Sequence, residues 1–598
     1  MNLSEIRNGN GETVQANYNK LSDHIRRLTP HGIQCSIFCG GINCKYENPE
    51  NWKPDSLAIQ GIYSHWVTDE ILAMARPSTM VIIQKNVIQQ FESLGIKSII
   101  NLQCPKEHAS CGQQLEISGF SYDPNIFMEQ NIYYYNFAWK DYGDATLEGL
   151  LNMVKVIAFA LTEGRVAIHC HAGLGRTGVL ISCYLVYSLR VSANDAIRYV
   201  RFKRPGSVQT RGQILCVRHF AQFILPQTIS YYIKENASKD KYMNEFTLQK
   251  FLRRQKVVLH GYEERNLKYL PKIVYVICER ILKLCACTEA SEYQQKNIPF
   301  TTGFYTEKLY SGMKRHESNY SISSISSPST ETIFLNVQME PSSPTSPNLS
   351  ENGDLTDSFS DISTLDGDDI NDDLLLENRC FQELETQKSF AQDHNDEEII
   401  IHDTQEVINS FITDYSKHDN EIRRKIRLYQ NEINCSQVGW LRLAVETDVD
   451  ILVALLLEWL EGLKVPVMKL EHFEQIVVMY KQTEACFQKF GMEESYLIEY
   501  LLSFLSRLQP LSKDCLDWLL KRMLGALSKQ TVIIKGHVIP SEKGFKRIGD
   551  GTLSCSCKFF QDLFDVIDQH HKQRTTLLRS AEKIIDNDNE ELDNIGFH

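Results

Sequence analysis

The chain shows two rhythms of apolar and polar residues. Between about residue 14 and residue 230, short β-branched runs such as 96–102 (IKSIINL) and 165–169 (RVAIH) stand between segments of helical length. Short apolar runs that alternate with helical segments are typical of strands buried in a mainly parallel sheet. This rhythm predicts an α/β domain over residues 61–230, preceded by an N-terminal extension over residues 1–60.

The second rhythm begins at about residue 403 and has the period of an α-helix. Apolar residues recur three and four positions apart at Leu452, Leu455, Leu456, Trp459, Leu460 and Leu463, and the stretch 516–527 repeats the pattern. Such stripes belong to helices that face a core. We therefore expect an all-α C-terminal region over residues 403–598 and a helical extension over residues 231–314.

The stretch between these regions has a different composition. Residues 317–350 are rich in Ser, Pro and Thr, and residues 351–399 hold 16 acidic residues against two basic ones. A segment with few apolar and many charged residues cannot bury enough surface to offset chain entropy, which predicts a disordered linker over residues 315–402. The linker accounts for the net charge of −13, so the remainder is close to neutral. The net charge therefore says little about the folded parts, and we expect no nucleic-acid partner because the one sharp positive feature of the chain, described below, is a site for a single phosphate.

The N-terminus carries no secretory signal pattern, and no run of about 18 apolar residues predicts a membrane span. Seventeen cysteines in such a chain are expected to be reduced thiols in the cytoplasm or nucleus. Cys35, Cys39 and Cys44 cluster near the N-terminus, and Cys555 and Cys557 lie close together, but neither group has the paired spacing of a zinc site. We therefore expect free thiols there, no metal and no cofactor.

The sharpest chemical signal is residues 166–178, VAIHCHAGLGRTG. A strand-like run ends at His169, a glycine-containing loop follows Cys170, and a helical apolar stretch comes next. Gly173 and Gly175 tolerate a left-handed backbone, so the loop can turn its N–H groups inward at a helix N-terminus and bind an oxyanion. Arg176 can grip two phosphate oxygens with its planar guanidinium. The motif predicts a phosphate site.

The residues of this site suggest a two-step reaction. Cys170 at its floor would attack phosphorus as a thiolate, and water would then hydrolyse the phosphocysteine. The leaving group needs a carboxylic acid, for which Asp141 in the segment FAWKDYGD is favoured over Asp144. Thr177 could donate to the Cys170 sulfur in the second step. The substrate-binding positions are His171, Ala172, Gly173, Leu174, Gly175 and Arg176.

Residues 169–178 closely resemble the H-C-x5-R-[ST]-G signature of cysteine-based protein tyrosine and dual-specificity phosphatases. The segment WKDYG at 139–143 is similar to that family's W-P-D-F-G acid loop, with Lys140 in place of proline. RPGSV at 204–208, followed by Gln213, resembles a segment of mitotic-exit phosphatases in which a glutamine helps to place the hydrolytic water; Gln209 is the rival position. The resemblance implies a cysteine-phosphatase fold, with a central, mostly parallel sheet flanked by helices, and a supporting role for His169.

The resemblance implies a protein phosphatase that acts on phosphotyrosine. The absence of an extended tyrosine-recognition loop favours dual specificity, and the preference between phosphotyrosine and phosphoserine or phosphothreonine stays open. Phosphoinositide phosphatases tend to carry lysine where this chain has His171 and Leu174, which favours phosphorylated proteins as substrates. The alternative, motivated by Lys140, is a low-activity scaffold that binds phosphoproteins. The C-terminal helical region is expected to bind a protein partner. Besides the cytoplasm and nucleus, the mitotic-exit resemblance suggests the centrosome or cilium.

Overall fold

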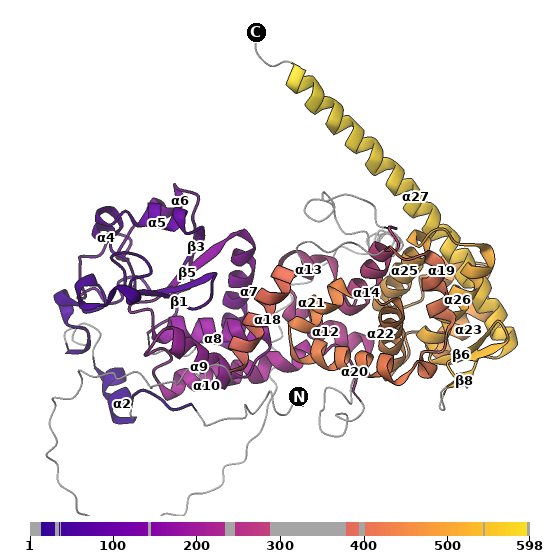
Figure 1. Ribbon diagram of the computed structural model, residues 1–598, viewed down its shortest axis with the longest axis horizontal. Coiled ribbons are helices and arrows are strands. Elements are labelled where there is room, and N and C mark those ends of the chain that lie inside the picture. The colour runs from indigo at the N-terminus through magenta and orange to yellow at the C-terminus, as the bar shows by residue number, and fades with distance from the viewer. Residues whose placement is uncertain are drawn as a thin grey trace, which may run out of the picture.

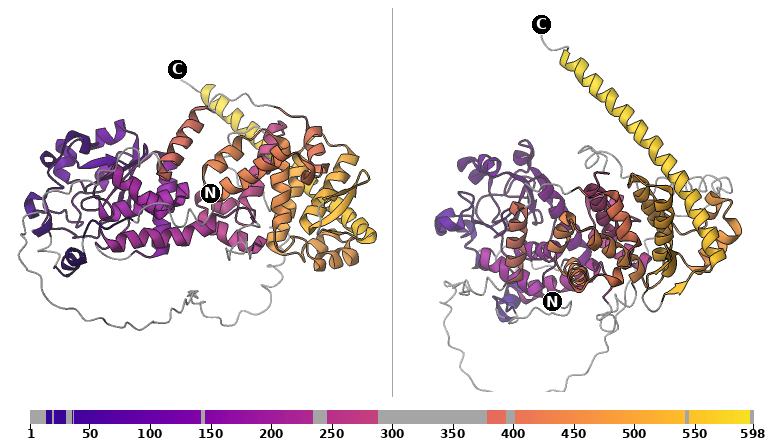
Figure 2. Two further views of the ribbon diagram at one scale, coloured as in Figure 1. Left: turned by 60° about the horizontal axis from the view of Figure 1, so that its bottom comes forward. Right: turned by 45° about the vertical axis from the view of Figure 1, so that its right-hand side comes forward.

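The computed structural model describes residues 14–18, 20–29, 35, 37–141, 145–233, 246–287, 378–393, 401–541 and 545–594. An α/β domain occupies the N-terminal part and a helical domain the C-terminal part, side by side (Figure 1). This confirms the expected fold class. The long helix α27 (Asp550–Asn594) projects away from the rest of the helical domain (Figures 1 and 2).

The α/β domain is built on a five-stranded sheet in the order β1-β2-β5-β3-β4. Strands β2, β5, β3 and β4 are parallel, and β1 pairs antiparallel with β2 at the edge. The predicted run 165–169 is the central strand β5, and its side chains alternate between the two faces of the sheet. The strands are β1 (Ser64–Trp66), β2 (Ile71–Met74), β3 (Ile96–Asn101), β4 (Tyr133–Asn136) and β5 (Arg165–His169).

Helices cover both faces of this sheet. Val166 and Ile168 of β5 join a core formed with α7 (Leu147–Glu163), α8 (Gly175–Leu189), α9 (Ala193–Lys203) and α10 (Arg211–Ile224). Ala167 faces the other way, into a smaller core. This opposite core includes residues of α4 (Thr79–Gln84), α5 (Val87–Ser93) and α6 (Asn125–Met128), and α2 (Lys20–Leu28) lies N-terminal to the sheet.

The helical domain has one continuous core. The helices α12 (Leu248–Val258), α13 (Gly261–Asn266) and α14 (Lys272–Leu284) fall in the predicted extension. Phe251 and Ile277 from this group pack in the same core as Leu455 and Trp459. The described part of residues 231–314 is therefore part of the C-terminal domain rather than a separate unit. The remaining helices are α19 (Thr404–Ile412), α20 (Asn420–Cys435), α21 (Val438–Val445), α22 (Val449–Gly462), α23 (Leu470–Met479), α24 (Thr483–Phe487), α25 (Met492–Arg507) and α26 (Lys513–Ser528).

This domain also contains a small sheet that the helical period did not predict. Strand β6 (Gln530–Ile534) pairs antiparallel with β7 (His537–Ile539) and parallel with β8 (Lys546–Arg547). Val532 and Ile534 alternate into the core and so follow a period of two residues. The C-terminal region is helical as expected, with this sheet added to it.

One part of the predicted linker is folded. Residues 378–393 lie within the stretch 315–402, and they form helix α18 (Arg379–Asp393). Cys380 is fully buried in the core of the α/β domain, and Phe381 and Leu384 pack against the same core. The prediction of disorder is wrong for this segment, because its acidic composition concealed a short apolar face. Residues 288–377 lie outside the described residues.

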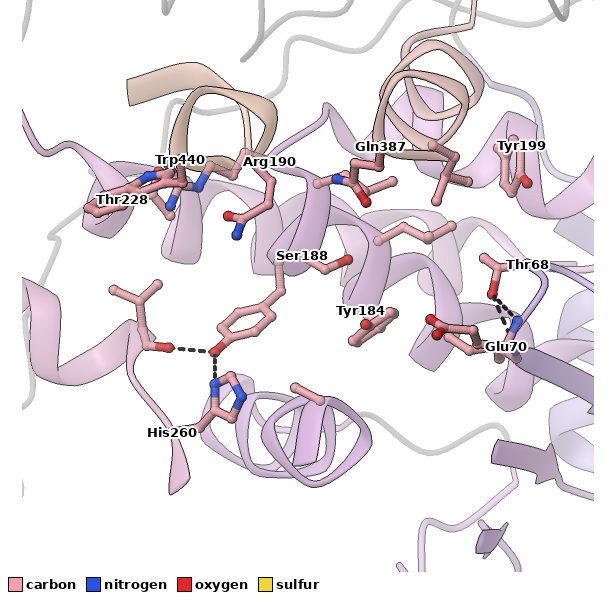
Figure 3. A pocket seen from close by; sticks show the side chains of 18 of the residues that line it. Thr68, Glu70, Tyr184, Ser188, Arg190, Tyr199, Thr228, His260, Gln387 and Trp440 are labelled. Atoms are coloured by element: carbon pink, nitrogen blue, oxygen red, sulfur yellow. Dashed lines mark hydrogen bonds between the residues drawn. The ribbon is translucent and has the colours of Figure 1, made fainter. Parts of the chain in front are cut away.

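A partly open pocket of about 690 Å³ lies between the two domains (Figure 3). It is lined by α8, by α18 and by residues of the helical domain such as His260 and Trp440. The Tyr187 hydroxyl of α8 donates a hydrogen bond to the Val258 carbonyl, and its oxygen lies 2.8 Å from His260 Nδ1. Among the described residues, none of the loop 170–176 lines this pocket. No described helix is both long and apolar enough to cross a bilayer.

Candidate active site

The loop that follows β5 has the shape of an anion-binding bowl. Cys170 lies directly after the strand and is almost fully buried. Gly173 has φ +68°, and a Cβ atom there would come within 2.0 Å of the Met74 carbonyl oxygen. Helix α8 then begins at Gly175, and its N-cap residue Leu174 makes no side-chain cap. The N–H groups of the first helical turn are therefore left for an oxyanion, as the motif predicted.

Arg204 supports this loop from behind. Its side chain is fully buried and donates to the carbonyls of Gly173 (2.5 Å) and Ala172 (2.9 Å). With these carbonyls turned outward, the intervening amides are free to point into the bowl. Burial and the charge of Arg204 lower the pKa of His65 to about 4, so its neutral ring accepts from Arg204 at 2.8 Å. Arg204, which the sequence analysis placed only in a motif, is a positioning residue of the loop.

Arg176 is held by a residue whose role the sequence analysis missed. Glu107 accepts from both Nη atoms of Arg176, with one N–O distance of 2.9 Å. Arg176 also donates to the carbonyl of Trp139 (2.6 Å). Its side chain is 2% exposed and that of Glu107 is 9% exposed, so this is a buried ion pair. Glu107 comes shortly after buried strand β3, which ends at the same sheet edge as β5. That position in the sequence could have indicated that Glu107 lies near the loop after β5.

Asp141 lies over the bowl. Its carboxylate is 3.4 Å from Arg176 Nε and 3.2 Å from His108 Nε2. Burial raises the pKa of Asp141, but the positive charge of Arg176 and the hydrogen bond from His108 outweigh it and hold this pKa below its usual range. The carboxylate is thus ionised here and occupies a place beside the arginine where a phosphoryl oxygen could bind. Asp144, the rival acid, lies outside the described residues.

His169 anchors the start of the loop. It is fully buried, its Nδ1 donates to the Cys170 carbonyl (3.0 Å), and the Tyr122 hydroxyl donates to its Nε2 (2.7 Å). Burial lowers the pKa of His169 to about 4, which keeps the ring neutral and matches this pair of bonds. These bonds place His169, predicted as a supporting residue, at the start of the loop, with Tyr122 as a partner that the sequence did not indicate.

The other predicted supporting residues lie close to the loop. Thr177 Oγ1 is buried and has no hydrogen-bond partner among the described residues. Gln213 Oε1 accepts from the backbone of Gln209 (2.7 Å) and caps α10. A Cβ on Gly175 would lie 2.7 Å from Gln213 Nε2 and 3.6 Å from Gln209 Oε1. Both glutamines therefore border the loop, and the choice between them as the water-positioning residue stays open.

The N-terminal extension contacts the same loop. His171 is buried and stacks on His108, with ring centroids 3.9 Å apart. Its Nε2 lies 3.5 Å from Cys44 Sγ. Leu174 and Ala172 pack beside Tyr63, which stacks on Trp52 at 3.7 Å. Residues 35–60 therefore form one wall of the site, although the sequence suggested only an extension.

The comparisons agree with this geometry. Residues 82–222 match the family model "Dual specificity phosphatase, catalytic domain". This stretch therefore forms a domain of the dual-specificity phosphatase class, and the resemblance drawn from the motif is confirmed.

Particular relatives carry a more specific name. "Protein tyrosine phosphatase domain-containing protein 1" of Danio rerio is 51% identical over 288 residues, which are 48% of this chain and 40% of the relative. Its namesake in Bos taurus is 56% identical over 268 residues, 45% of this chain and 33% of the relative. "Dual specificity protein phosphatase CDC14C" of Symphalangus syndactylus is 26% identical over 186 residues, 30% of this chain and 35% of the relative. The matches thus span about two fifths or less of these relatives.

Among solved structures, "Crystal structure of Tk-PTP in the active form" is similar, with 20% identity and a TM-score of 0.22, over 27% of this chain and 96% of that chain.

Proposed function

We propose that this chain is a protein phosphatase that hydrolyses phosphotyrosine, and also phosphoserine and phosphothreonine, through a phosphocysteine intermediate. The observation that carries the proposal is the convergence of Cys170, Arg176 and Asp141 at the N-terminus of α8. The family match of residues 82–222 supports the same reaction class.

In the first step the phosphoryl group sits in the loop, with its oxygens on the backbone N–H groups and on Arg176. The Cys170 thiolate attacks phosphorus in line with the leaving oxygen. The P–O bond to the substrate breaks as the S–P bond forms, and the proton of Asp141 passes to the leaving oxygen. The fixed donors of the loop stabilise the charge on the transferring group without reorganisation.

In the second step water attacks the phosphocysteine. Asp141, now a carboxylate, takes a proton from this water, while Gln213 or Gln209 orients it beside Gly175. The S–P bond breaks and returns the thiolate, to which the buried Thr177 hydroxyl donates. Phosphate then leaves the bowl.

The ionised state of Asp141 is compatible with its role as an acid. A phosphoryl dianion that binds on Arg176 adds negative charge beside the carboxylate. At an effective dielectric of about 20, one unit charge at about 4 Å is worth roughly 4 kcal/mol, or about three pKa units. Substrate binding would thus raise the pKa of Asp141 and let it carry the proton that the leaving group needs.

The test is hydrolysis of a small aryl phosphate by the full chain. The full chain is required because α12 and α14 share their core with the C-terminal helices, so a fragment ending near residue 315 would expose that core. We expect turnover by the wild type and none by Cys170→Ser. Equal rates for the two proteins would refute the proposed function.

The lining of the bowl supports phosphorylated proteins as substrates. His171 is buried against His108, and Leu174 packs beside Tyr63, so neither position offers an exposed cation to a polyphosphorylated ring. Parallel assays with phosphopeptides and phosphoinositides would test this preference. Faster release of phosphate from the phosphoinositides would contradict it.

A phosphoprotein-binding scaffold is the second candidate. The Asp141 carboxylate lies 3.4 Å from Arg176 Nε, and Lys140 replaces the proline of the family's acid loop; both features favour a site that binds phosphate but turns over slowly. A scaffold would capture phosphopeptides without releasing phosphate. Turnover near about 1 s⁻¹, within the ordinary range of enzymes, would exclude it.

The cellular setting is part of the proposal. The resemblance of residues 204–208 to a segment of mitotic-exit phosphatases supports a role in cell division, with cytoplasmic, nuclear, centrosomal or ciliary location. The helical domain would supply the protein partner. Imaging of the tagged full chain through the cell cycle would test the location, and a uniform distribution at every stage would count against it.

A further inference from the structure

Four cysteine thiols meet beside the active site, although they come from two distant parts of the chain. Cys35, Cys44 and Cys111 form one buried cluster, and Cys39 packs against it. Cys35, Cys44 and Cys111 are at most 1% exposed. The cluster consists of Cys35, Cys39, Cys44 and Cys111.

The backbone brings the two segments together. Gly112 N donates to the Gly41 carbonyl at 3.0 Å, which joins the loop after β3 to the N-terminal segment. Cys39 N donates to the Cys35 carbonyl at 3.1 Å and closes a tight turn. Gly40 at φ +96° and Gly41 at φ +57° complete this turn with a left-handed backbone. The Cys111 thiol therefore lies against a turn of the N-terminal segment that carries the other three thiols.

The N-terminal segment has little regular structure of its own. The described residues 35 and 37–56 contain short 3₁₀ helices and no strand, apart from the helical end near Cys35. Their buried cluster is made of cysteines with one tyrosine, Tyr46, packed against it. A short irregular segment with so small an apolar core needs a staple such as a disulfide or a structural metal. All four cysteines carry free thiols.

We propose that Cys35, Cys39, Cys44 and Cys111 bind one structural Zn²⁺ as thiolates in a tetrahedral site. Closed sites of four cysteines are a standard ligand set of structural zinc, with Zn–S distances of about 2.3 Å. On binding, four S–H bonds are exchanged for four Zn–S bonds and four protons leave to solvent, with no change of oxidation state. This assignment replaces the expectation of free thiols and no metal at this place.

The surroundings suit such a centre. His108 Nδ1 lies 3.1 Å from Cys35 Sγ, and His171 Nε2 lies 3.5 Å from Cys44 Sγ. Both rings can thus donate N–H bonds to ligating sulfur, which is how outer partners commonly fix metal ligands. Arg76 holds the backbone of Cys111 through its carbonyl at 2.8 Å and places a positive charge beside the thiolates. Glu47, the nearby acid, is neutralised by Arg76 at 2.7 Å.

The metal would connect the N-terminal segment to the catalytic machinery. Cys111 belongs to the same loop as Glu107 and His108, which hold Arg176 and Asp141. His171 is the residue after the nucleophile. Zinc would therefore fix the wall formed by residues 35–60 against the loop that positions the phosphate-binding arginine.

The first experiment measures metal content by mass spectrometry on the full chain, made in zinc-supplemented medium and purified under reducing conditions without chelator or nickel resin. We expect one zinc per chain in the wild type and none in Cys111→Ser, which removes the one thiol that the loop after β3 contributes to the cluster. Cys104→Ser is the matched control, because Cys104 lies in the same loop outside the cluster, and it should retain one zinc. Cys39→Ser removes the least buried ligand and serves if Cys111→Ser does not fold.

The second experiment identifies the ligands without any substitution. Zinc-edge X-ray absorption of the wild type should show four sulfur atoms at about 2.3 Å. Nitrogen or oxygen in the first shell, iron in place of zinc, disulfide-linked cysteines, sub-stoichiometric zinc after reconstitution, or full zinc in both cysteine variants would overturn the assignment. None of these readouts depends on turnover. The zinc proposal can therefore be refuted while the proposed phosphatase function holds, and the phosphatase function can be refuted while the zinc proposal holds.

Discussion

The buried pair of Glu107 and Arg176 allows a quantitative prediction about Glu107→Gln. The carboxylate accepts from both Nη atoms of Arg176, and the two side chains are 9% and 2% exposed. Glutamine keeps the shape but offers one oxygen, and its amide N–H groups would face a second donor of the arginine. Breaking a buried ion pair costs about 3–5 kcal/mol, and the one remaining bond reduces this loss to about 2–4 kcal/mol.

The same change should slow catalysis. Arg176 would keep its bonds to backbone carbonyls and its ion pair with Asp141 but lose the group that fixes its plane. Misplacement of a positioning group by about 1 Å can cost about 100-fold in rate. We therefore expect kcat/KM for an aryl phosphate to fall roughly 100-fold, which corresponds to about 2.7 kcal/mol.

Urea unfolding and steady-state kinetics would be measured together on the wild type and the variant. Glu116→Gln is the control: Glu116 lies on a nearby loop, and it accepts from the neutral Thr79 hydroxyl at 2.6 Å, a bond that glutamine can keep. A double-mutant cycle with Arg176→Met would isolate the coupling in the unfolding free energy. If Glu107→Gln matched the control in both stability and kcat/KM, the argument that this ion pair positions the arginine would be refuted.

Three further predictions follow from contacts in the site. Gly173→Ala should abolish turnover and lower the midpoint of thermal unfolding, because its Cβ would come within 2.0 Å of the Met74 oxygen at φ +68°; activity above a tenth of the wild-type value would contradict this. Tyr122→Phe should cost about 1–3 kcal/mol in urea unfolding, because it leaves His169 Nε2 buried without a donor; an unchanged midpoint would show that the bond is immaterial. The free energy of unfolding should fall between pH 6.5 and about 4, because burial lowers the pKa of His169 to about 4 and the unfolded chain binds the proton first. His169→Asn should flatten this slope by up to one proton, and identical slopes would exclude His169 as the cause.

The local sequence was sufficient to predict the phosphate loop. The features of this loop follow one another directly along the chain: a strand, a cysteine, a loop with two glycines, and an arginine at a helix start. Their geometry depends on backbone preferences that act over a few residues. The partners of that loop were not visible. Glu107, Tyr122 and His65 reach it from other strands and loops, and no spacing along the chain relates them to Cys170.

The domain boundaries show the same division. The helical period identified the apolar stripe of α22. It did not show that α12 and α14, which precede α22 by more than 150 residues in the sequence, pack in the same core. Composition predicted a linker, yet Cys380, Phe381 and Leu384 form a face that gains its stability only against the α/β domain.

The sequence by itself was enough to predict the chemistry proposed for this protein, because a candidate nucleophile, an arginine and flexible glycines lie within ten residues of one another. Only the tertiary structure decided which groups hold that arginine in place and which thiols meet. Cys111 joins Cys35, Cys39 and Cys44 because the loop after β3 and the N-terminal segment are pinned together at Gly41 and Gly112. Contacts of this kind depend on the packing of segments that are remote in sequence, and local patterns along the chain carry no record of them.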